Sequence, residues 1–425
     1  MSCLFALTLR FTVAAFTGGL INDVSQQGRN RFSAGFLSRL NQYVHRQRRV
    51  SGDGPDAARV GGRLAWVSNG YIAGLTLVLP FSAWLSQQFG TRRVFLLSLS
   101  IFSFGALAAG MADSLTSLVM WRALQGMGGG LLIPPGQSLT WQQFRPHERA
   151  KLSAVVMLVG LLAPACSPAI GGVLVQSLSW RWVFFASLPI ALLTFGLAAL
   201  WIKDERRVAR PGGLLRLSLL RDPLLRFSML VYLCVPGTFI GINVVGMFYL
   251  QSVTGMSPSA IGALMLPWSL ASFVAIATTG RYFNRLGPRP LIAVGCLLQA
   301  VGIVTLAGVN AHTASSMLIA AFIFMGAGGS LCSSTAQSSA FLNVANGDMP
   351  DASALWNLNR QLSFLMGSAL LAALLSAFLL YWPTPQAWRG VFIAAAALTL
   401  APLLGCLTFD NRAIIMRLHG KMENK

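Results

Sequence analysis

Long apolar stretches separated by short polar ones recur along most of this 425-residue chain. A helix needs about 20 apolar residues to cross the hydrocarbon core of a bilayer, and eleven stretches have roughly that length. Because helices satisfy their own backbone groups in lipid, the pattern predicts an all-α, polytopic membrane helical bundle. The predicted spans cover residues 66–86, 94–112, 117–140, 152–175, 182–201, 227–250, 259–280, 291–309, 316–341, 354–380 and 391–409.

The composition also indicates a membrane protein. Hydrophobic residues make up 55% of the chain and charged residues only 10%, with a mean hydropathy of +0.63, whereas soluble domains carry about 25% charged residues. The formal net charge of +20 would suit a nucleic-acid-binding protein, so the positions of the charges decide between the two classes.

The positive charges gather on one side of the predicted membrane. The outer loops hold two, Arg181 and Arg389. With residues 92–93 taken as cytoplasmic, the inner loops and tail hold 19 Lys and Arg residues: two at 92–93, three at 145–151, seven at 203–226, three at 281–289 and four after 410. This asymmetry follows the positive-inside rule. The basic excess therefore reports membrane topology, and we expect no nucleic-acid partner.

The chain shows no residues arranged for catalysis or metal binding. Its four histidines fall in polar segments, and its cysteines lack the spacing of a metal site or a disulfide framework. We interpret the cysteines as small packing residues, and the sequence predicts no enzyme activity, no cofactor and no metal. The six cysteines are scattered, nearly all in apolar stretches: Cys3, Cys166, Cys234, Cys296, Cys332 and Cys406.

Two pairs of segments repeat at nearly one spacing. Residues 83–93 (AWLSQQFGTRR) match residues 280–290 (GRYFNRLGPRP) at a shift of 197, and residues 125–138 match residues 325–338 at a shift of 200. Parallel repeats are a transporter architecture, so we predict two pseudo-symmetric six-helix halves, the first helix being missing or aberrant. The expected boundaries are 1–62 for an atypical basic N-terminal segment, 63–201 for the first half, 202–226 for a cytoplasmic linker, 227–409 for the second half and 410–425 for a cytoplasmic tail.

Several segments resemble signatures of the major facilitator superfamily, specifically of its bacterial drug:proton antiporters, which act in multidrug efflux. The resemblance covers residues 65 to about 410 and rests on AWVSNGY (65–71), AWLSQQFGTRR (83–93), MWRALQGMGGG (120–130), APACSPAIGG (163–172), SWRWVFFASLPI (179–190) and NLNRQL (357–362). It implies proton-coupled efflux of small organic molecules by alternating access, performed by a monomer in the bacterial inner (cytoplasmic) membrane. The short linker implies the twelve-helix plan of the family.

The loop signature and its copy are expected to gate the cytoplasmic mouth. In the resembling family an Asp precedes the arginine of this signature and latches adjacent helix ends. This chain has Gln87 and Asn284 at those positions, whose amides can hydrogen-bond backbone groups but carry no charge. The other members are turn-forming glycines and arginines, which topology alone would also require: Gly90, Arg92, Gly287 and Arg289.

Residues 161–172 (LLAPACSPAIGG) place two prolines four residues apart inside an apolar stretch. Proline kinks a membrane helix, and small residues let a neighbouring helix approach closely. We interpret the bend as a seal at one end of a central cavity that limits leak; a merely structural kink is the alternative. The residues of the bend are Pro164, Pro168, Gly171 and Gly172.

Arg122 is the strongest single candidate, because an arginine inside a span is costly and marks function by default. Gln125 lies one turn along the same helix face. The resemblance implies that the corresponding arginine takes part in proton coupling and substrate exchange, and snorkelling to the outer surface is the alternative. Arg360 is the second arginine within a predicted span, with the inner surface close by.

Uncharged polar residues that interrupt apolar stretches are candidates to line a substrate cavity, although such residues more often pack or face lipid. They are Asn69, Tyr71, Gln137, Asn243, Tyr249, Gln337, Asn357 and Gln361, with Trp121, Met247 and Trp268 as apolar lining.

None of the twelve Asp and Glu residues lies within the eleven predicted spans, although a proton-driven antiporter usually needs a titratable group there. In the resembling family that group sits on the first helix, which the repeat places at residues 30–53, a segment too polar to span. Residues 3–22 would span only weakly. We interpret residues 1–62 as foreign to the fold, similar to GC-rich DNA translated in a wrong frame, with a genuine extension as the alternative. Efflux of drugs, export of a specific metabolite and a transport-inactive remnant lacking its first helix therefore all stay open.

Overall fold

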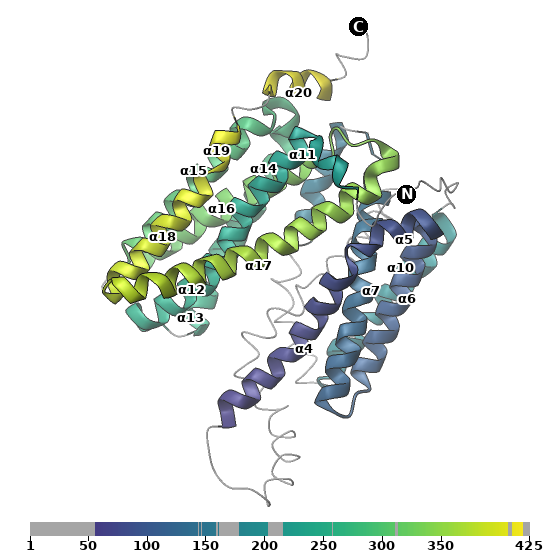
Figure 1. Cartoon of the computed structure of the whole chain (residues 1–425), viewed down its shortest axis with the longest axis horizontal. Helices are drawn as coiled ribbons and strands as arrows, with labels where there is room; N and C mark the ends of the chain where they lie inside the picture. Colours follow the sequence, from purple (N-terminus) through teal and green to yellow (C-terminus); the bar gives the residue numbers. More distant parts are fainter. Residues whose placement is uncertain are drawn as a thin grey trace, which may run out of the picture. The chain divides into compact units, whose positions relative to one another are not determined.

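The computed structural model describes residues 56–142, 144–145, 147–158, 160, 178–202, 216–256, 258–310, 313–406 and 410–419. Within these residues every regular element is a helix (Figure 1). The prediction of an all-α polytopic bundle is therefore confirmed. Eight helical segments of the described chain are long and apolar enough to cross a membrane: Thr91–Gly110, Trp182–Leu200, Pro223–Ser252, Ala260–Leu286, Pro288–Ala307, Ser315–Ala340, Asn346–Tyr381 and Thr384–Gly405.

The chain divides into two compact units, unit 1 (Met1–Thr140 and Val159–Leu215) and unit 2 (Trp141–Leu158 and Arg216–Lys425). The helices of unit 1 are α4 (Asp56–Val78), α5 (Phe81–Phe89), α6 (Thr91–Gly110), α7 (Leu115–Gln142, whose last two residues belong to unit 2), α9 (Trp182–Phe185) and α10 (Leu188–Trp201).

Unit 2 contains a helical stretch at residues 147–158 and all the remaining elements. They are η3 (Leu217–Arg221), α11 (Pro223–Tyr232), the π-helical turn η4 (Leu233–Gly237), α12 (Thr238–Thr254), α13 (Pro258–Ala263), α14 (Met265–Leu286), α15 (Pro288–Ala307), α16 (Ser315–Ala340), η5 (Asn346–Asp348), α17 (Met349–Tyr381), α18 (Thr384–Leu400), α19 (Pro402–Gly405) and α20 (Asn411–Leu418).

Eight of the predicted spans correspond to these apolar helices; of the other three, one is broken, one is a continuous helix outside this set and one runs beyond the described residues. The span predicted at 66–86 is broken between α4 and α5, because Pro80 lacks the N–H that a continuous helix would use. In addition, α4 begins at Asp56, ten residues before the predicted start. The span predicted at 117–140 is α7, which holds Pro134 and Pro135, and the one at 152–175 runs beyond the described residues.

In each unit, helices pack around an apolar core. In unit 1, α6 lies against α10, and the core includes Leu75, Phe95 and Phe102. In unit 2, α15 lies between α16 and α18, while α12 lies against α17 (Figure 1). This packing buries helix faces that would otherwise contact only lipid.

The repeat detected in the sequence has the same packing geometry in both copies. A Cβ added to Gly105 or Gly302 would collide with α7 at Gln125 or with α16 at Met325, which match at the shift of 200. The same holds for four further glycines, with their contacts given in parentheses: Gly126 (Tyr71), Gly326 (Trp268), Gly128 (Phe102) and Gly328 (Gln299). The small residues thus serve the same helix crossings in both halves.

The two copies of the loop turn on equivalent glycines. Gly90 joins α5 to α6 with φ 88°, and Gly287 joins α14 to α15 with φ 72°. Positive φ is strained for residues with a Cβ, so the repeat keeps glycine at both turns.

Candidate functional site

Arg122 lies inside unit 1 with its guanidinium fully enclosed. Its side chain is 2% exposed, and Nη1 donates a hydrogen bond to Oε1 of Gln125 at 2.6 Å. Nε donates to the carbonyl oxygen of Val67 at 3.4 Å. The guanidinium carbon stands 4.6 Å from the ring centre of Tyr71 and 5.6 Å from that of Phe184. We name Arg122, Gln125 and Tyr71 the arginine cluster.

The surroundings of Arg122 explain how a charge is accommodated there. Burying an ion without partners is very costly, and here two hydrogen bonds and two aromatic faces replace water. Among the described residues no carboxylate pairs with this guanidinium. Because the side chain is buried, snorkelling to the outer surface does not describe its position.

Glycines on α4 and α7 bring the cluster together. A Cβ on Gly126 would collide with the backbone of Tyr71, and one on Gly74 with the backbone of Ala123. Only the absence of side chains at these positions allows the two helix backbones to come this close. Tyr71 and Gln125 are therefore 2% and 3% exposed.

At the three repeat-related positions the second unit carries apolar residues in place of the arginine cluster. The repeat shifts place Phe322, Met325 and Trp268 at the positions of Arg122, Gln125 and Tyr71. Trp268 stacks on Phe239 with ring centres 5.1 Å apart. The same helix crossing is thus filled by apolar side chains in one copy and by a charge in the other.

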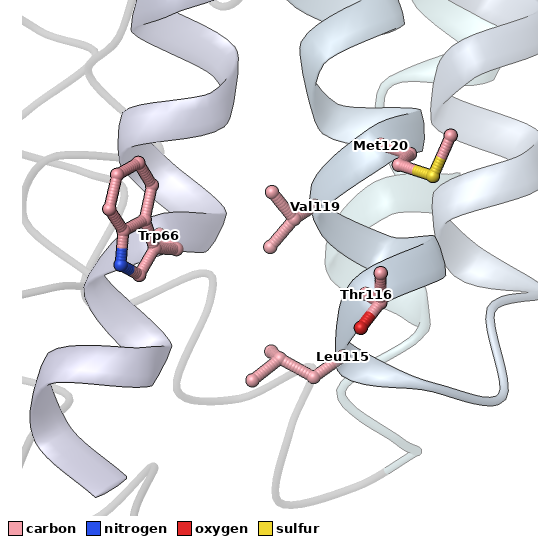
Figure 2. Close-up of a pocket in the computed structure, with 5 residues that line it drawn as sticks. All are labelled: Trp66, Leu115, Thr116, Val119 and Met120. Atoms are coloured by element: carbon pink, nitrogen blue, oxygen red, sulfur yellow. The ribbon is translucent and has the colours of Figure 1, made fainter. Parts of the chain in front are cut away.

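A shallow cavity of about 360 Å³ lies one turn from Arg122 on the same two helices. Figure 2 shows Trp66 on α4 opposite four residues of α7, namely Leu115, Thr116, Val119 and Met120. Trp66 precedes Val67, the carbonyl partner of Arg122. Trp66 and Met120 are 62% and 68% exposed, so the cavity is open to its surroundings and mainly apolar.

The two loop copies hold their polar residues differently. In unit 1, Arg92 donates from Nη2 to the carbonyl oxygen of Ala199 at 2.6 Å, while Gln87 is half-buried. In unit 2, Asn284 donates to the carbonyl oxygen of His147 at 2.6 Å. The amide at the latch position thus bonds a backbone group, as expected for Asn284.

The other predicted residues are dispersed. Arg360 is half-buried on α17, and Asn357 is buried and donates to the carbonyl oxygen of Ser353 on its own helix. Tyr249 is buried and donates to the carbonyl oxygen of Val309. Asn69 is exposed; Asn243, Gln137 and Gln361 are half-buried; Gln337 is 7% exposed. The predicted bend at Pro164, Pro168, Gly171 and Gly172 lies outside the described residues.

Asp351 and Gln299 are among the buried polar residues that the sequence does not single out. Asp351 is 3% exposed in the first turn of α17, a position the predicted span began too late to include. Pro350 indicates that the helix begins before residue 354, since proline favours the first turn of a helix. Gln299 is fully buried on α15 and donates to the carbonyl oxygen of Val235 in η4 at 2.9 Å; as the one amide in an apolar helix, it could have been singled out.

The cysteines, scattered in the sequence, meet in one part of unit 2. Four of them are buried in a single core cluster, and the sulfur atoms of Cys296 and Cys332 are 3.8 Å apart. Within the described residues no group of three His, Cys, Asp or Glu is placed to hold a metal ion. The four buried cysteines are Cys234, Cys296, Cys332 and Cys406.

Comparison with known proteins gives consistent results. A family model described as Major Facilitator Superfamily matches residues 60–368 and 254–414. The Multidrug resistance protein B homolog of Mycobacterium tuberculosis (strain ATCC 25618 / H37Rv) is 27% identical over 373 residues, covering 74% of this chain and 69% of that protein. The Drug efflux pump JefA of Mycobacterium tuberculosis (strain CDC 1551 / Oshkosh) is 26% identical over 377 residues, covering 74% and 73%.

Solved structures share the fold at low sequence identity. The human organic anion transporter MFSD10 (TETRAN) superposes with a TM-score of 0.72 at 16% identity, covering 95% of this chain and 98% of that one. The proton:xylose symporter XylE superposes with a TM-score of 0.69 at 15% identity, covering 96% of each chain.

Proposed function

The chain belongs to the Major Facilitator Superfamily, and on that premise we propose that it exports drugs or similar small organic molecules across the bacterial inner membrane in exchange for protons. The names of its relatives, a multidrug resistance protein homolog and a drug efflux pump, support the substrate class. The observation that carries the proposal is the buried, carboxylate-free guanidinium of Arg122.

Arg122 acts as a fixed positive charge in this scheme. Arginine does not lose its proton in proteins, so it is not the proton carrier. A fixed cation in a desolvated site favours the ionised form of any acid that approaches it. The proton carrier in this scheme is therefore an acid that comes next to Arg122, and Arg122 favours the release of its proton.

The cavity beside the arginine cluster fits the apolar part of a substrate. Cavities of about 300–1,000 Å³ suit small organic ligands, and this one presents Trp66, Val119 and Met120. Methionine adapts to ligands of different shape. We assign to this cavity the aromatic or aliphatic part of a drug, with Arg122 one turn away.

Alternating access is the transport mechanism that we propose for the two halves. Transporters built from parallel repeats move one half against the other around a site at their interface. In this proposal the chain works as a monomer, and a small organic substrate and protons are its only partners besides lipid.

Drug accumulation in everted membrane vesicles tests the proposal. The measured quantity is proton-gradient-dependent uptake of a fluorescent lipophilic cation. Arg122→Gln should lower the initial rate at least about tenfold, because hydrogen bonds to a charged group are worth about 1.5–3 kcal/mol each and about 1.4 kcal/mol corresponds to a factor of ten.

Arg389→Gln is the control, since Arg389 is an exposed arginine of α18 outside the arginine cluster and the gating loops, and its removal should leave the rate nearly unchanged. Arg122→Lys keeps the charge but loses the planar guanidinium group with its several hydrogen-bond donors, and it should give an intermediate rate. Equal rates for Arg122→Gln and Arg389→Gln, with both proteins folded, would contradict the role of Arg122.

A second candidate, a transport-inactive protein, is favoured by one observation. Among the described residues, Asp351 is the only buried carboxylate, and it lies in the first turn of α17. The middle of the described helices therefore offers no buried carboxylate that could carry a proton. If vesicles with the unmodified chain accumulate no drug, while vesicles with a known efflux pump do, the inactive state is the better description.

A further inference from the structure

One face of α14 changes from apolar to basic along its length. Leu266, Leu270 and Val274 are 70%, 69% and 58% exposed, and Arg281 and Arg285 are also exposed. Their spacings of four, four, seven and four residues place all five on one side of an α-helix. An apolar stripe therefore ends in two arginines.

The dimensions of this stripe match one leaflet of a bilayer. Eleven residues separate Leu270 from Arg281, which corresponds to about 16 Å along a helix. Half of the hydrocarbon core measures about 15 Å. When acyl chains lie along the leucines, the arginines stand at the level of the headgroups.

Helix α20 brings further positive charge to the same end of unit 2. The side chain of Asn411 accepts a hydrogen bond from the backbone N–H of Arg289 at 3.1 Å and donates to the carbonyl oxygen of Leu286 at 2.8 Å. It thereby holds α20 over the turn at Gly287, next to the end of α14 (Figure 1). Arg289 and Arg412 are both exposed there.

The helix α20 is amphipathic as well as anchored. Leu418 is buried and Ile414 packs against the same core cluster, while Arg412 and Met416 face outward. A short helix with a basic and apolar outer face lies well in the headgroup region of a membrane. We name Arg281, Arg285, Arg289 and Arg412 the basic patch.

Within the described part of the chain, the charges of the basic patch have no acidic partner. Among the described residues no carboxylate forms an ion pair with any of its four guanidinium groups. The ring centre of Tyr282 lies 5.9 Å from the guanidinium carbon of Arg281, and tyrosine is common at membrane interfaces.

The repeated fold does not require arginine at these positions. The shift of 197 places Trp84 at the position of Arg281 and Gln88 at that of Arg285. The first copy makes the same helix and turn without these two charges. Arg281 and Arg285 are therefore a property of the second half that packing and turn geometry leave unexplained.

We propose that the basic patch binds the headgroup of an anionic phospholipid, whose acyl chains lie along the exposed leucines of α14. Residues four apart on a helix are neighbours, so Arg281 and Arg285 both reach one phosphate. Arginine suits phosphate because its planar fork donates several charge-assisted hydrogen bonds. The adjacent apolar stripe distinguishes a lipid from a soluble anion.

Lipid-dependent thermal stability of the purified full-length protein tests this inference without reference to transport. Phosphatidylglycerol added to the detergent-solubilised chain should raise the unfolding temperature more than phosphatidylcholine does, and should be retained at least about threefold more strongly in native mass spectrometry. Because the attraction is electrostatic, this preference should shrink at high salt.

The double variant Arg281→Gln/Arg285→Gln removes both charges, and glutamine is the residue that the first half has at the position of Arg285 (Gln88). This variant should abolish the preference for phosphatidylglycerol. Arg389→Gln, at an exposed arginine of α18, should keep it, and Arg281→Lys/Arg285→Lys should keep most of it. Equal response of the unmodified protein to both lipids would overturn the proposal, as would an unchanged preference in the glutamine variant. Equal stabilisation by inorganic phosphate would indicate a site for free anions instead.

Discussion

Substituting Gly126 by alanine should separate α4 from α7 and disturb the arginine cluster. The new Cβ would lie 2.8 Å from the carbonyl carbon of Tyr71, and closer still to its oxygen, whereas ordinary contacts begin at 3.4 Å. The helices must therefore part by at least about 0.6 Å, because the obstacle is backbone and cannot rotate away. The ring of Tyr71, now 4.6 Å from the Arg122 guanidinium, then moves toward the limit of about 6 Å for cation–π attraction.

The energetic cost follows from two opposing terms. Overpacking a well-packed site costs about 1–3 kcal/mol, while replacing glycine by alanine inside a helix gains up to about 1 kcal/mol. We expect Gly126→Ala to lose about 1–2 kcal/mol of stability, measured by thermal unfolding in detergent, and to reduce efflux in vesicles.

Gly196→Ala is the matched control for this substitution. Gly196 lies in α10 of the same unit, and a Cβ there meets nothing within 4 Å. It should therefore leave stability unchanged or raise it slightly. If Gly126→Ala proves as stable and as active as Gly196→Ala, the close approach of α4 and α7 is not what holds the cluster.

Three further substitutions test other contacts by thermal unfolding. Gly287→Ala should cost more than Gly90→Ala. Both place a Cβ on a residue with positive φ and extended ψ, which costs about 1–3 kcal/mol. Only at Gly287 would the Cβ also meet a side chain, that of Asn411 on α20, 2.9 Å away, so equal losses would refute the α20 contact. Asp222→Ala should cost about 1 kcal/mol, since its carboxylate accepts hydrogen bonds from the first turn of α11, and Asp222→Asn should recover most of it. Arg149→Met should cost about 1–3 kcal/mol of stability, because the buried guanidinium donates a hydrogen bond to the carbonyl oxygen of Phe341, at the end of α16, at 2.7 Å. Faster hydrogen exchange confined to the end of α16 would confirm that this bond caps the helix. Unchanged exchange would contradict it.

Residues whose role depends on local spacing could be predicted from the sequence. The pairing of Arg122 with Gln125 follows from three-residue spacing on a helix. The glycine turns at Gly90 and Gly287 were visible because they recur at the shift of the repeat. The long apolar helices were predictable because lipid imposes their length and composition.

Contacts between distant segments could not be predicted. Tyr71 was one of several polar candidates, and only the close crossing of α4 and α7 places it against Arg122. The gathering of four cysteines in one core likewise depends on how α15, α16 and their neighbours pack. Asp351 was left out because the predicted span begins at residue 354, whereas α17 begins at Met349. The apolar pattern weakens at helix ends and so does not mark the first turn.

Drug-dependent proton movement in proteoliposomes tests the proposed exchange most directly. The unmodified chain is reconstituted with a pH-sensitive dye inside the vesicles, and a lipophilic cationic drug is added outside. Our account predicts proton flux opposite to drug uptake that requires the protein and is at least about tenfold slower with Arg122→Gln. Drug movement with no accompanying change in internal pH would contradict it.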